Sequence, residues 1–101
     1  MYDDWKPEPV RDEIEREITR GIPNSTVVVT PSVMEGSEVN YVAIFLSAAK
    51  YDGPHIFLHP DDLDDNPGIV VSRYEGDEQI VVEEVASVTA ALDWLRNELA
   101  S

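Results

Sequence analysis

The segment Asn40-Tyr-Val-Ala-Ile-Phe-Leu-Ser-Ala-Ala49 is apolar on both of the faces that a β-strand presents. Successive side chains of a strand point to opposite sides, so Val42 and Ile44 would lie on one face of a sheet. Tyr41 and Phe45 would lie on the other face. A strand that is apolar on both sides has to be covered on both sides or lie at the centre of its sheet. We therefore expect this segment to be the central strand of the fold.

Helical patterns precede and follow the β-rich part of the chain. Pro9 stands where a first helical residue is often proline, and Gly21 followed by Pro23 is a typical helix end. Between them, one apolar stripe recurs at every fourth residue: Val10, Ile14, Ile18 and Ile22. Ser87 is a typical N-cap for a second helix. The apolar stripe of that helix comprises Val88, Ala91, Leu92, Leu95 and Leu99.

Further β-segments surround the central one. Residues 25–30 are rich in β-branched side chains, and residues 55–59 form a short apolar run between two prolines. Residues 68–74 and 79–85 have the pattern of a hairpin that turns at residues 75–78. The sequence therefore predicts an α+β fold in the order α-β-β-(β)-β-β-α. It would be an antiparallel four- to five-stranded meander sheet, with the N-terminal and the C-terminal helix packed on one face.

Two helices on one face leave the second face of this sheet to be explained. Tyr41 and Phe45 are the candidate apolar interface on that face, to be closed by another copy of the chain or by a partner. The alternative is that residues 31–39 fold across the same face and bury both rings. Either arrangement would cover the second side of the predicted central strand.

Length and composition favour one domain that spans residues 1–101, with residues 1–8 as a mobile N-terminal segment. The chain has no cysteine, which excludes disulfides, thiolate metal sites and thiol nucleophiles. No apolar run approaches the roughly 20 residues that a membrane helix needs, and the first residues lack the pattern of a signal peptide. A cytoplasmic location is the expectation.

The charge of the chain is strongly one-sided, with 21 acidic residues against 7 basic ones and a formal net charge of −14. Residues 61–84 carry nine of the acids and one of the bases, so −8 of that charge lies in this segment. Such a balance disfavours binding to nucleic acid or to an anionic membrane and favours a basic protein surface as the partner. Its predicted binding strip comprises Asp61, Asp62, Asp64, Asp65, Asp77 and Glu78.

Residue patterns that carry chemistry are weak in this chain. His55 and His59 on one strand would stand about 13 Å apart, too far for a single metal ion to bridge. A calcium loop that starts at Asp62 would need glycine and glutamate where Pro67 and Arg73 stand. No nucleophile elbow and no phosphate-binding glycine loop occurs. We expect a protein that is not an enzyme and that has neither a metal site nor a cofactor.

Two functions of different classes fit these observations. Fourteen charges correspond to about 24 Å of duplex DNA, at one charge per roughly 1.7 Å. In composition and size the chain thus resembles the small acidic DNA-mimic inhibitors of phages and mobile elements, although no motif carries the resemblance. That resemblance implies a non-enzymatic anti-defence or immunity protein, which binds a basic, nucleic-acid-binding protein. The alternative is an ordinary cytoplasmic, homodimeric domain of a halophilic organism, whose acidity is an adaptation to salt.

Overall fold

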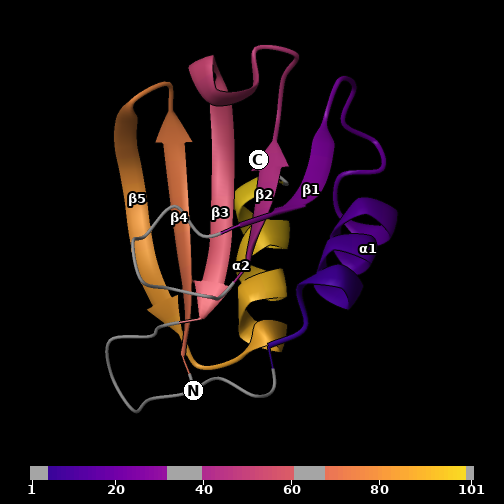
Figure 1. Ribbon diagram of the computed structural model, residues 1–101, viewed down its shortest axis with the longest axis vertical. Helices are drawn as coiled ribbons and strands as arrows, with labels where there is room; N and C mark the ends of the chain where they lie inside the picture. The colour runs from indigo at the N-terminus through magenta and orange to yellow at the C-terminus, as the bar shows by residue number, and fades with distance from the viewer. Residues whose placement is uncertain (1–4, 32–39, 61–67, 100–101) are drawn as a thin grey trace.

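A five-stranded antiparallel sheet, in the order β1-β2-β3-β4-β5, forms the centre of the protein (Figure 1). The computed structural model describes residues 5–31, 40–60 and 68–99. Its elements are α1 (Pro7–Glu17), β1 (Thr26–Thr30), β2 (Tyr41–Phe45), the 3-10 turn η1 (Lys50–Asp52), β3 (Pro54–Pro60), β4 (Ile69–Glu75), β5 (Glu78–Val85) and α2 (Val88–Leu99). The predicted meander with a helix at each end is confirmed, and residues 55–59 belong to a strand of the main sheet.

The middle position of the sheet is taken by β3 rather than by the segment that was predicted to be central. That segment forms β2, which ends at Phe45 and lies second, between β1 and β3. All residues of β2 are nevertheless buried. A strand is buried on both faces when it has a neighbouring strand on each edge and a layer packed on each face. The strand that lies second in the sheet meets both conditions. Apolarity of both faces therefore indicates an interior strand but does not fix its place in the order.

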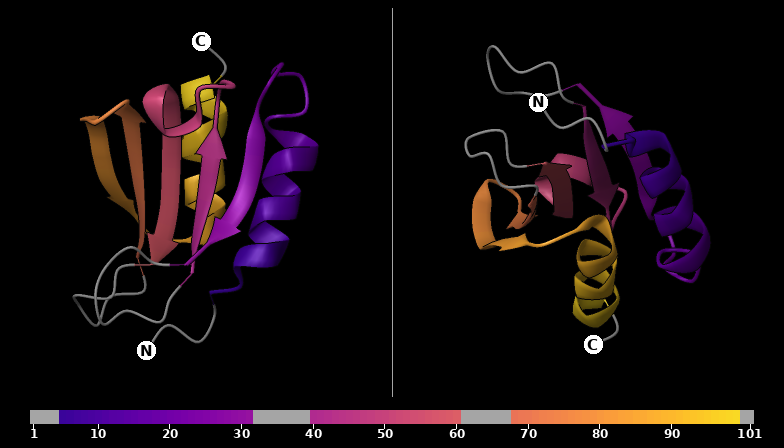
Figure 2. Two further views of the ribbon diagram at one scale, coloured as in Figure 1. Left: turned by 45° about the horizontal axis from the view of Figure 1, so that its top comes forward. Right: turned by 90° about the horizontal axis from the view of Figure 1, so that it is seen from below.

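Both helices pack on the same face of the sheet (Figure 2). Ile14 of α1 and Leu92 and Leu95 of α2 belong to one core cluster. The strand residues of that cluster are Val27, Val42, Ile44, Ile56, Leu58, Ile69 and Val71. The register places Val42 opposite Leu58, and Leu58 opposite Val71, so these side chains form one row across the sheet. The predicted sharing of one sheet face by the two helices is confirmed.

The helix ends follow local hydrogen bonding. α1 ends at Glu17, about one turn before the predicted end, because the N–H groups of Ile18 and Thr19 both donate to the carbonyl oxygen of Ile14. The chain then turns away, and Ile22 lies outside the helix. At the start of α2, the Ser87 hydroxyl accepts a hydrogen bond from the N–H of Ala90 at 3.2 Å, as predicted for an N-cap. Within the described part of the chain, no helix is long and apolar enough to cross a membrane.

Candidate interaction surface

The face of the sheet opposite the helices carries a continuous layer of rings. We call this set the aromatic layer, and it comprises Tyr41, Phe45, Tyr51, His55, Phe57, His59 and Tyr74. Alternation along β2, β3 and β4 brings six of these rings to one face, and η1 adds Tyr51. These rings explain why β2 is apolar on both sides, because they cover much of the sheet face opposite the helices.

The two histidines lie in different parts of the aromatic layer. His59 stacks on Tyr41, with 4.2 Å between ring centroids, whereas His55 stacks on Tyr74 at 5.3 Å. Each histidine places Nδ1 2.9 Å from a backbone carbonyl oxygen, that of Gly53 for His55 and that of Pro60 for His59. A carbonyl oxygen only accepts hydrogen bonds, so Nδ1 carries the proton in both rings. Both histidines are therefore held in place as members of the ring layer.

The candidate interface residues Tyr41 and Phe45 are already buried within a single chain, with 6% and 4% of their surface exposed. Phe45 meets the ring of Tyr51 edge-on at 4.8 Å, which covers part of it from the solvent side. Tyr51 itself is 52% exposed. Val82, which lies opposite Ser72 on the same face, is also exposed. An interface through this face would thus be made by these exposed neighbours more than by Tyr41 and Phe45.

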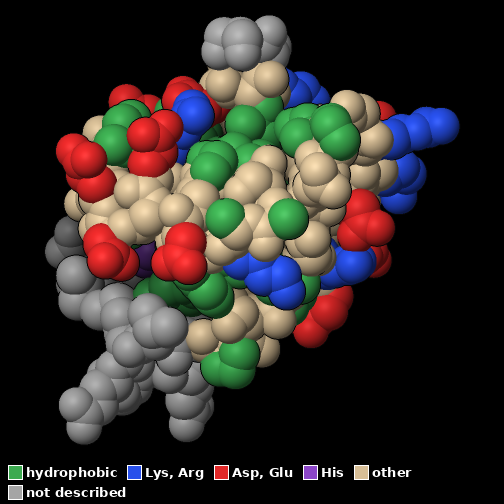
Figure 3. Space-filling model, turned by 90° about the horizontal axis from the view of Figure 1, so that it is seen from above, with side chains coloured by type: hydrophobic (Ala, Val, Ile, Leu, Met, Phe, Trp, Pro, Cys, Tyr) green, Lys and Arg blue, Asp and Glu red, His purple; other side chains and the backbone are tan. Residues whose placement is uncertain are grey.

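A group of carboxylates stands at the end of the sheet where β4 turns into β5. We call it the acidic end, and it comprises Asp52, Glu75, Asp77 and Glu78. The N–H of Gly76 donates to the carbonyl oxygen of Gly53 at 3.2 Å, which ties the hairpin turn to η1. Glu75 and Glu78 are direct cross-strand partners. Figure 3 shows acidic side chains gathered on the left, over the β4–β5 hairpin.

The acidic end differs from the acids of α1 in its pairing. On the helix, Arg11 contacts Asp12 and Glu15 at 2.5 and 2.7 Å, and other arginines contact Glu13 and Glu17. Within the described ranges, no ion pair involves any of the four carboxylates of the acidic end. The nearest bases in the sequence are Lys50, two residues before Asp52, and Arg73, two residues before Glu75, and Arg73 pairs with Glu98 instead. The helix surface is thus largely neutralised, whereas the acidic end keeps its charge.

Only part of the predicted binding strip falls on described residues. Asp77 and Glu78 are exposed at the turn of the hairpin. The remaining members, Asp61, Asp62, Asp64 and Asp65, lie outside the described residues. Their segment joins the sheet where Pro60 pairs with Ile69, at the opposite end of β4 from Glu75. Six residue steps along β4 correspond to about 20 Å, so the two parts of the strip are attached to opposite ends of the sheet.

Two further carboxylates of β5 point to opposite faces of the sheet, as expected for neighbours on a strand. Glu83 pairs with Val71 on the helix side, where its Oε2 accepts a hydrogen bond from the indole Nε1 of Trp94 at 2.5 Å. Glu84 pairs with Val70 on the side of the aromatic layer. Glu83 therefore helps to hold α2 on the sheet.

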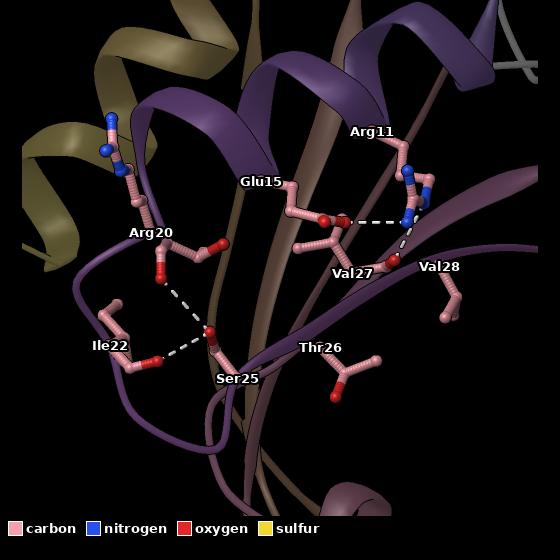
Figure 4. A pocket seen from close by; sticks show the side chains of 9 residues that line it. Arg11, Glu15, Arg20, Ile22, Ser25, Thr26, Val27 and Val28 are labelled. Atoms are coloured by element: carbon pink, nitrogen blue, oxygen red, sulfur yellow. Dashed lines mark hydrogen bonds and ion pairs between the residues drawn. The ribbon is translucent and has the colours of Figure 1, made fainter.

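A hollow of about 570 Å³ lies between α1 and the edge strand β1 (Figure 4). Arg11 reaches across it, with Nε 2.9 Å from the carbonyl oxygen of Val27 and with a second nitrogen on Glu15. Ser25 donates to the carbonyl oxygens of Ile22 and Thr19 at 2.8 and 3.2 Å. These polar groups are satisfied within the chain, so the hollow is explained by the docking of α1 on β1.

The described residues contain no group of three or more histidine, cysteine, aspartate or glutamate side chains that is placed to hold a metal ion. His55 and His59 are four residues apart on the same strand and stack on different tyrosines. This arrangement gives no common point at which their ring nitrogens meet. We therefore assign no metal or catalytic role to these residues.

The sequence patterns place Glu75 in a hairpin turn and identify none of Tyr51, Asp52, Phe57 and Tyr74 as part of this surface. The alternation of rings at positions 55, 57 and 59 indicates the aromatic layer once residues 55–59 are placed beside β2. No local pattern brings Asp52 to the hairpin turn, because their approach depends on the contact between Gly53 and Gly76.

Comparison of the chain with models of protein families, with curated proteins and with solved structures finds no match.

Proposed function

We propose that this chain is a non-enzymatic, cytoplasmic interaction protein that presents carboxylates to the basic surface of a nucleic-acid-binding protein and inhibits it as a DNA mimic. The observation that supports the proposal most directly is that the acidic end forms no ion pair within the described residues, whereas four of the five acids of α1 are paired with arginines. If the acids served only to keep the protein soluble, there would be no reason for the acidic end to differ from α1 in its ion pairing.

The acidic end also has a cost for the fold. Glu75 and Glu78 lie directly opposite each other on neighbouring strands, and like charges in such positions destabilise a sheet. A lysine at either position would remove the repulsion. The presence of four acids at this end is explained if they contact a basic partner in the complex. Their summed field would also steer the encounter with that partner.

The length of the sheet is compatible with the mimicry of a duplex. The acidic end and the attachment points of residues 61–67 are separated by the length of β4, about 20 Å. The same length of duplex DNA carries roughly twelve phosphates. A DNA-binding surface that contacts phosphates over this length would span the sheet from the acidic end to Pro60 and Ile69.

Displacement from immobilised duplex DNA tests the proposal. Proteins from a lysate of the source organism are retained on the DNA, and the wild-type chain is expected to release one or a few of them. An acidic-end variant replaces Asp52, Glu75, Asp77 and Glu78 by the corresponding amides and is expected to release much less. The matched control replaces four acids of α1, Asp12, Glu13, Glu15 and Glu17, and so removes the same number of charges.

The control variant is expected to behave like the wild type, because its substituted carboxylates already have arginine partners. Equal release by both variants would show that net charge alone acts and would contradict a defined binding site. Release of nothing by the wild type would contradict the proposal as a whole.

A further inference from the structure

The two edges of the sheet differ in how they are covered. At one edge, α1 packs against β1, and the Nε of Arg11 donates a hydrogen bond to the backbone carbonyl oxygen of Val27 at 2.9 Å. At the other edge, β5 pairs with β4 on one side, and no described helix or strand lies along its outer side (Figures 1 and 2). An edge strand directs every second N–H and carbonyl group away from the sheet, where a further strand can bind them.

β5 has few of the features that keep edge strands from pairing with other chains. Such strands are often short, bulged, or interrupted by lysine or proline. β5 is eight residues long and contains neither lysine nor proline. Its register with β4 shifts at Ile80, and residues 81–85 then pair regularly with residues 69–73. This regular segment is therefore open to pairing on its outer side.

Exposed apolar side chains lie on the same strand. Three large hydrophobic side chains of the described residues are exposed, and two of them belong to β5: Ile80 and Val82, with 47% and 55% of their surface exposed. Val82 points to the face of the aromatic layer, where it lies opposite Ser72. A strand added beside β5 would cover Val82 with a side chain of its own, because directly opposed residues share one face. Burial of this apolar surface would add to the backbone hydrogen bonds.

The charge of β5 indicates which kind of strand would pair with it. Glu83 and Glu84 are consecutive, so they lie on opposite faces of the sheet, and the strand has no basic residue. Opposite charges in directly facing positions stabilise a strand pair, whereas like charges destabilise it. An added strand with two consecutive basic residues would place one opposite each glutamate. A second copy of β5 would instead bring only further carboxylates.

We infer that the outer edge of β5 is a docking site for an extended, basic segment of the partner, which joins the sheet as an additional strand. The inference rests on the proposed function, from which it takes the basic partner, and it specifies how that partner binds. In the antiparallel direction, the segment would carry two lysines or arginines opposite Glu84 and Glu83, followed by an apolar residue opposite Val82. Its backbone would bind the outward N–H and carbonyl groups of residues 81–85.

The inference is tested with the synthetic peptide Thr-Val-Lys-Lys-Val-Thr-Val. Its titration into the full chain at low salt, followed by NMR of the backbone amides, measures the dissociation constant and locates the perturbed residues. Two further versions of the peptide carry N-methyl groups on alternate residues, at the odd or at the even positions. One version should bind like the parent peptide, because its methyl groups point away from β5. The other should bind at least about tenfold more weakly, the effect of about two lost hydrogen bonds.

Three results of this titration would overturn the inference. Equal binding of the two methylated versions would show that the peptide is held by charge and not by its backbone. Equal binding of a peptide with Glu-Glu in place of Lys-Lys would show that the charge of β5 selects nothing. The third is failure of the parent peptide to perturb residues 81–85 at millimolar concentration.

Two variants that each add one lysine locate the site. Val82→Lys places the charge on β5, and Thr26→Lys places it on β1, at the opposite edge of the same sheet face. Both side chains are exposed, so neither substitution opens a cavity in the core, and circular dichroism verifies the fold. Val82→Lys is expected to weaken binding about threefold or more, the size of one unfavourable cross-strand pair. Thr26→Lys is expected to leave binding unchanged, and equal weakening by both would overturn the inference.

Sedimentation of the wild type tests a second copy of the chain as the occupant of this edge. A monomer is expected, because two β5 strands repel each other. A dimer that dissociates in Val82→Lys but not in Thr26→Lys would overturn the inference.

The displacement experiment separates the inference from the proposed function. Equal release of proteins from duplex DNA by the wild type and by Val82→Lys, with little release by the acidic-end variant, would leave the proposed function standing and overturn the inference. No release by the wild type, together with the expected alternation between the methylated peptides, would contradict the proposed function and support strand addition at β5.

Discussion

The guanidinium of Arg73 on β4 lies 2.5 Å from the carboxylate of Glu98 on α2, and both side chains are about three-quarters removed from solvent, with 25% and 29% exposed. This pair joins the C-terminal helix to the sheet across 25 positions of sequence. Removal of one partner leaves the other charge partly desolvated. We expect Arg73→Met, which keeps much of the apolar stem, to lower the free energy of unfolding by about 1–2 kcal/mol.

Arg96→Met is the matched control for that substitution. Arg96 also lies on α2, but its contacts with Asp93 and Glu13 are more exposed to solvent. Loss of such surface pairs is expected to cost less than about 0.5 kcal/mol. Urea unfolding of both variants makes the comparison. Equal losses would show that burial of the Arg73 pair adds nothing to its contribution.

The second prediction concerns the contact of α2 with the sheet. Leu95 is fully buried in the core cluster, so Leu95→Ala removes apolar contacts and leaves a cavity. The expected loss of stability is about 2–5 kcal/mol. Thr89→Ala on the exposed side of the same helix serves as control and is expected to change stability by less than about 0.5 kcal/mol. A loss below that limit for Leu95→Ala would contradict the packing of α2.

The start of α2 offers a third test. The Ser87 hydroxyl satisfies the N–H of Ala90, and Ser87→Ala removes this cap. The free energy of unfolding is expected to fall by about 1 kcal/mol, whereas Ser87→Gly should cost only a few tenths because glycine is tolerated at this position. Thermal unfolding followed by circular dichroism measures both variants. A larger loss for glycine than for alanine would mean that helix propensity outweighs the cap.

Local periodicity was sufficient to predict most of the fold. Apolar stripes of the helical period identified both helices and the face that they share, and the Ser87 cap followed from its residue type. The place of β2 in the sheet did not follow, because two-sided apolarity reports cover on both faces and not strand order. The early end of α1 did not follow either, since Ile18 and Ile22 continue the apolar stripe while the backbone leaves the helix after Glu17.

The candidate surface was less predictable than the fold, because it depends on contacts between distant segments. Asp77 and Glu78 were identified from charge alone. Asp52 joins them only through the hydrogen bond between Gly76 and Gly53, which no local pattern encodes. Three of the four ion pairs of the acids on α1 are local, whereas the contact of Arg96 with Glu13 depends on the packing of α2.

The fourth prediction separates the proposed function from adaptation to salt. A halophilic domain should unfold when salt falls below molar concentrations, whereas a DNA mimic should be folded in dilute buffer. We expect the wild type to be fully folded at 20 mM salt, because its core is complete within the described residues of one chain. Circular dichroism as a function of salt concentration measures this. An unfolded chain at low salt that folds near molar salt would favour the halophilic alternative.

The last prediction addresses the acids of the predicted strip that lie outside the described residues. Their segment joins the sheet at Pro60 and Ile69, at the end remote from the acidic end. Replacing Asp62, Asp64 and Asp65 by asparagine should leave stability equal or higher, because self-repulsion decreases. In the displacement experiment we expect this variant to release less protein from duplex DNA than the wild type. The loss should be largest at low salt, since charges farther apart than about 8–10 Å are screened at physiological ionic strength. Unchanged release at every salt concentration would restrict the binding surface to the acidic end, and the mimicry of a duplex along the length of β4 would then be wrong.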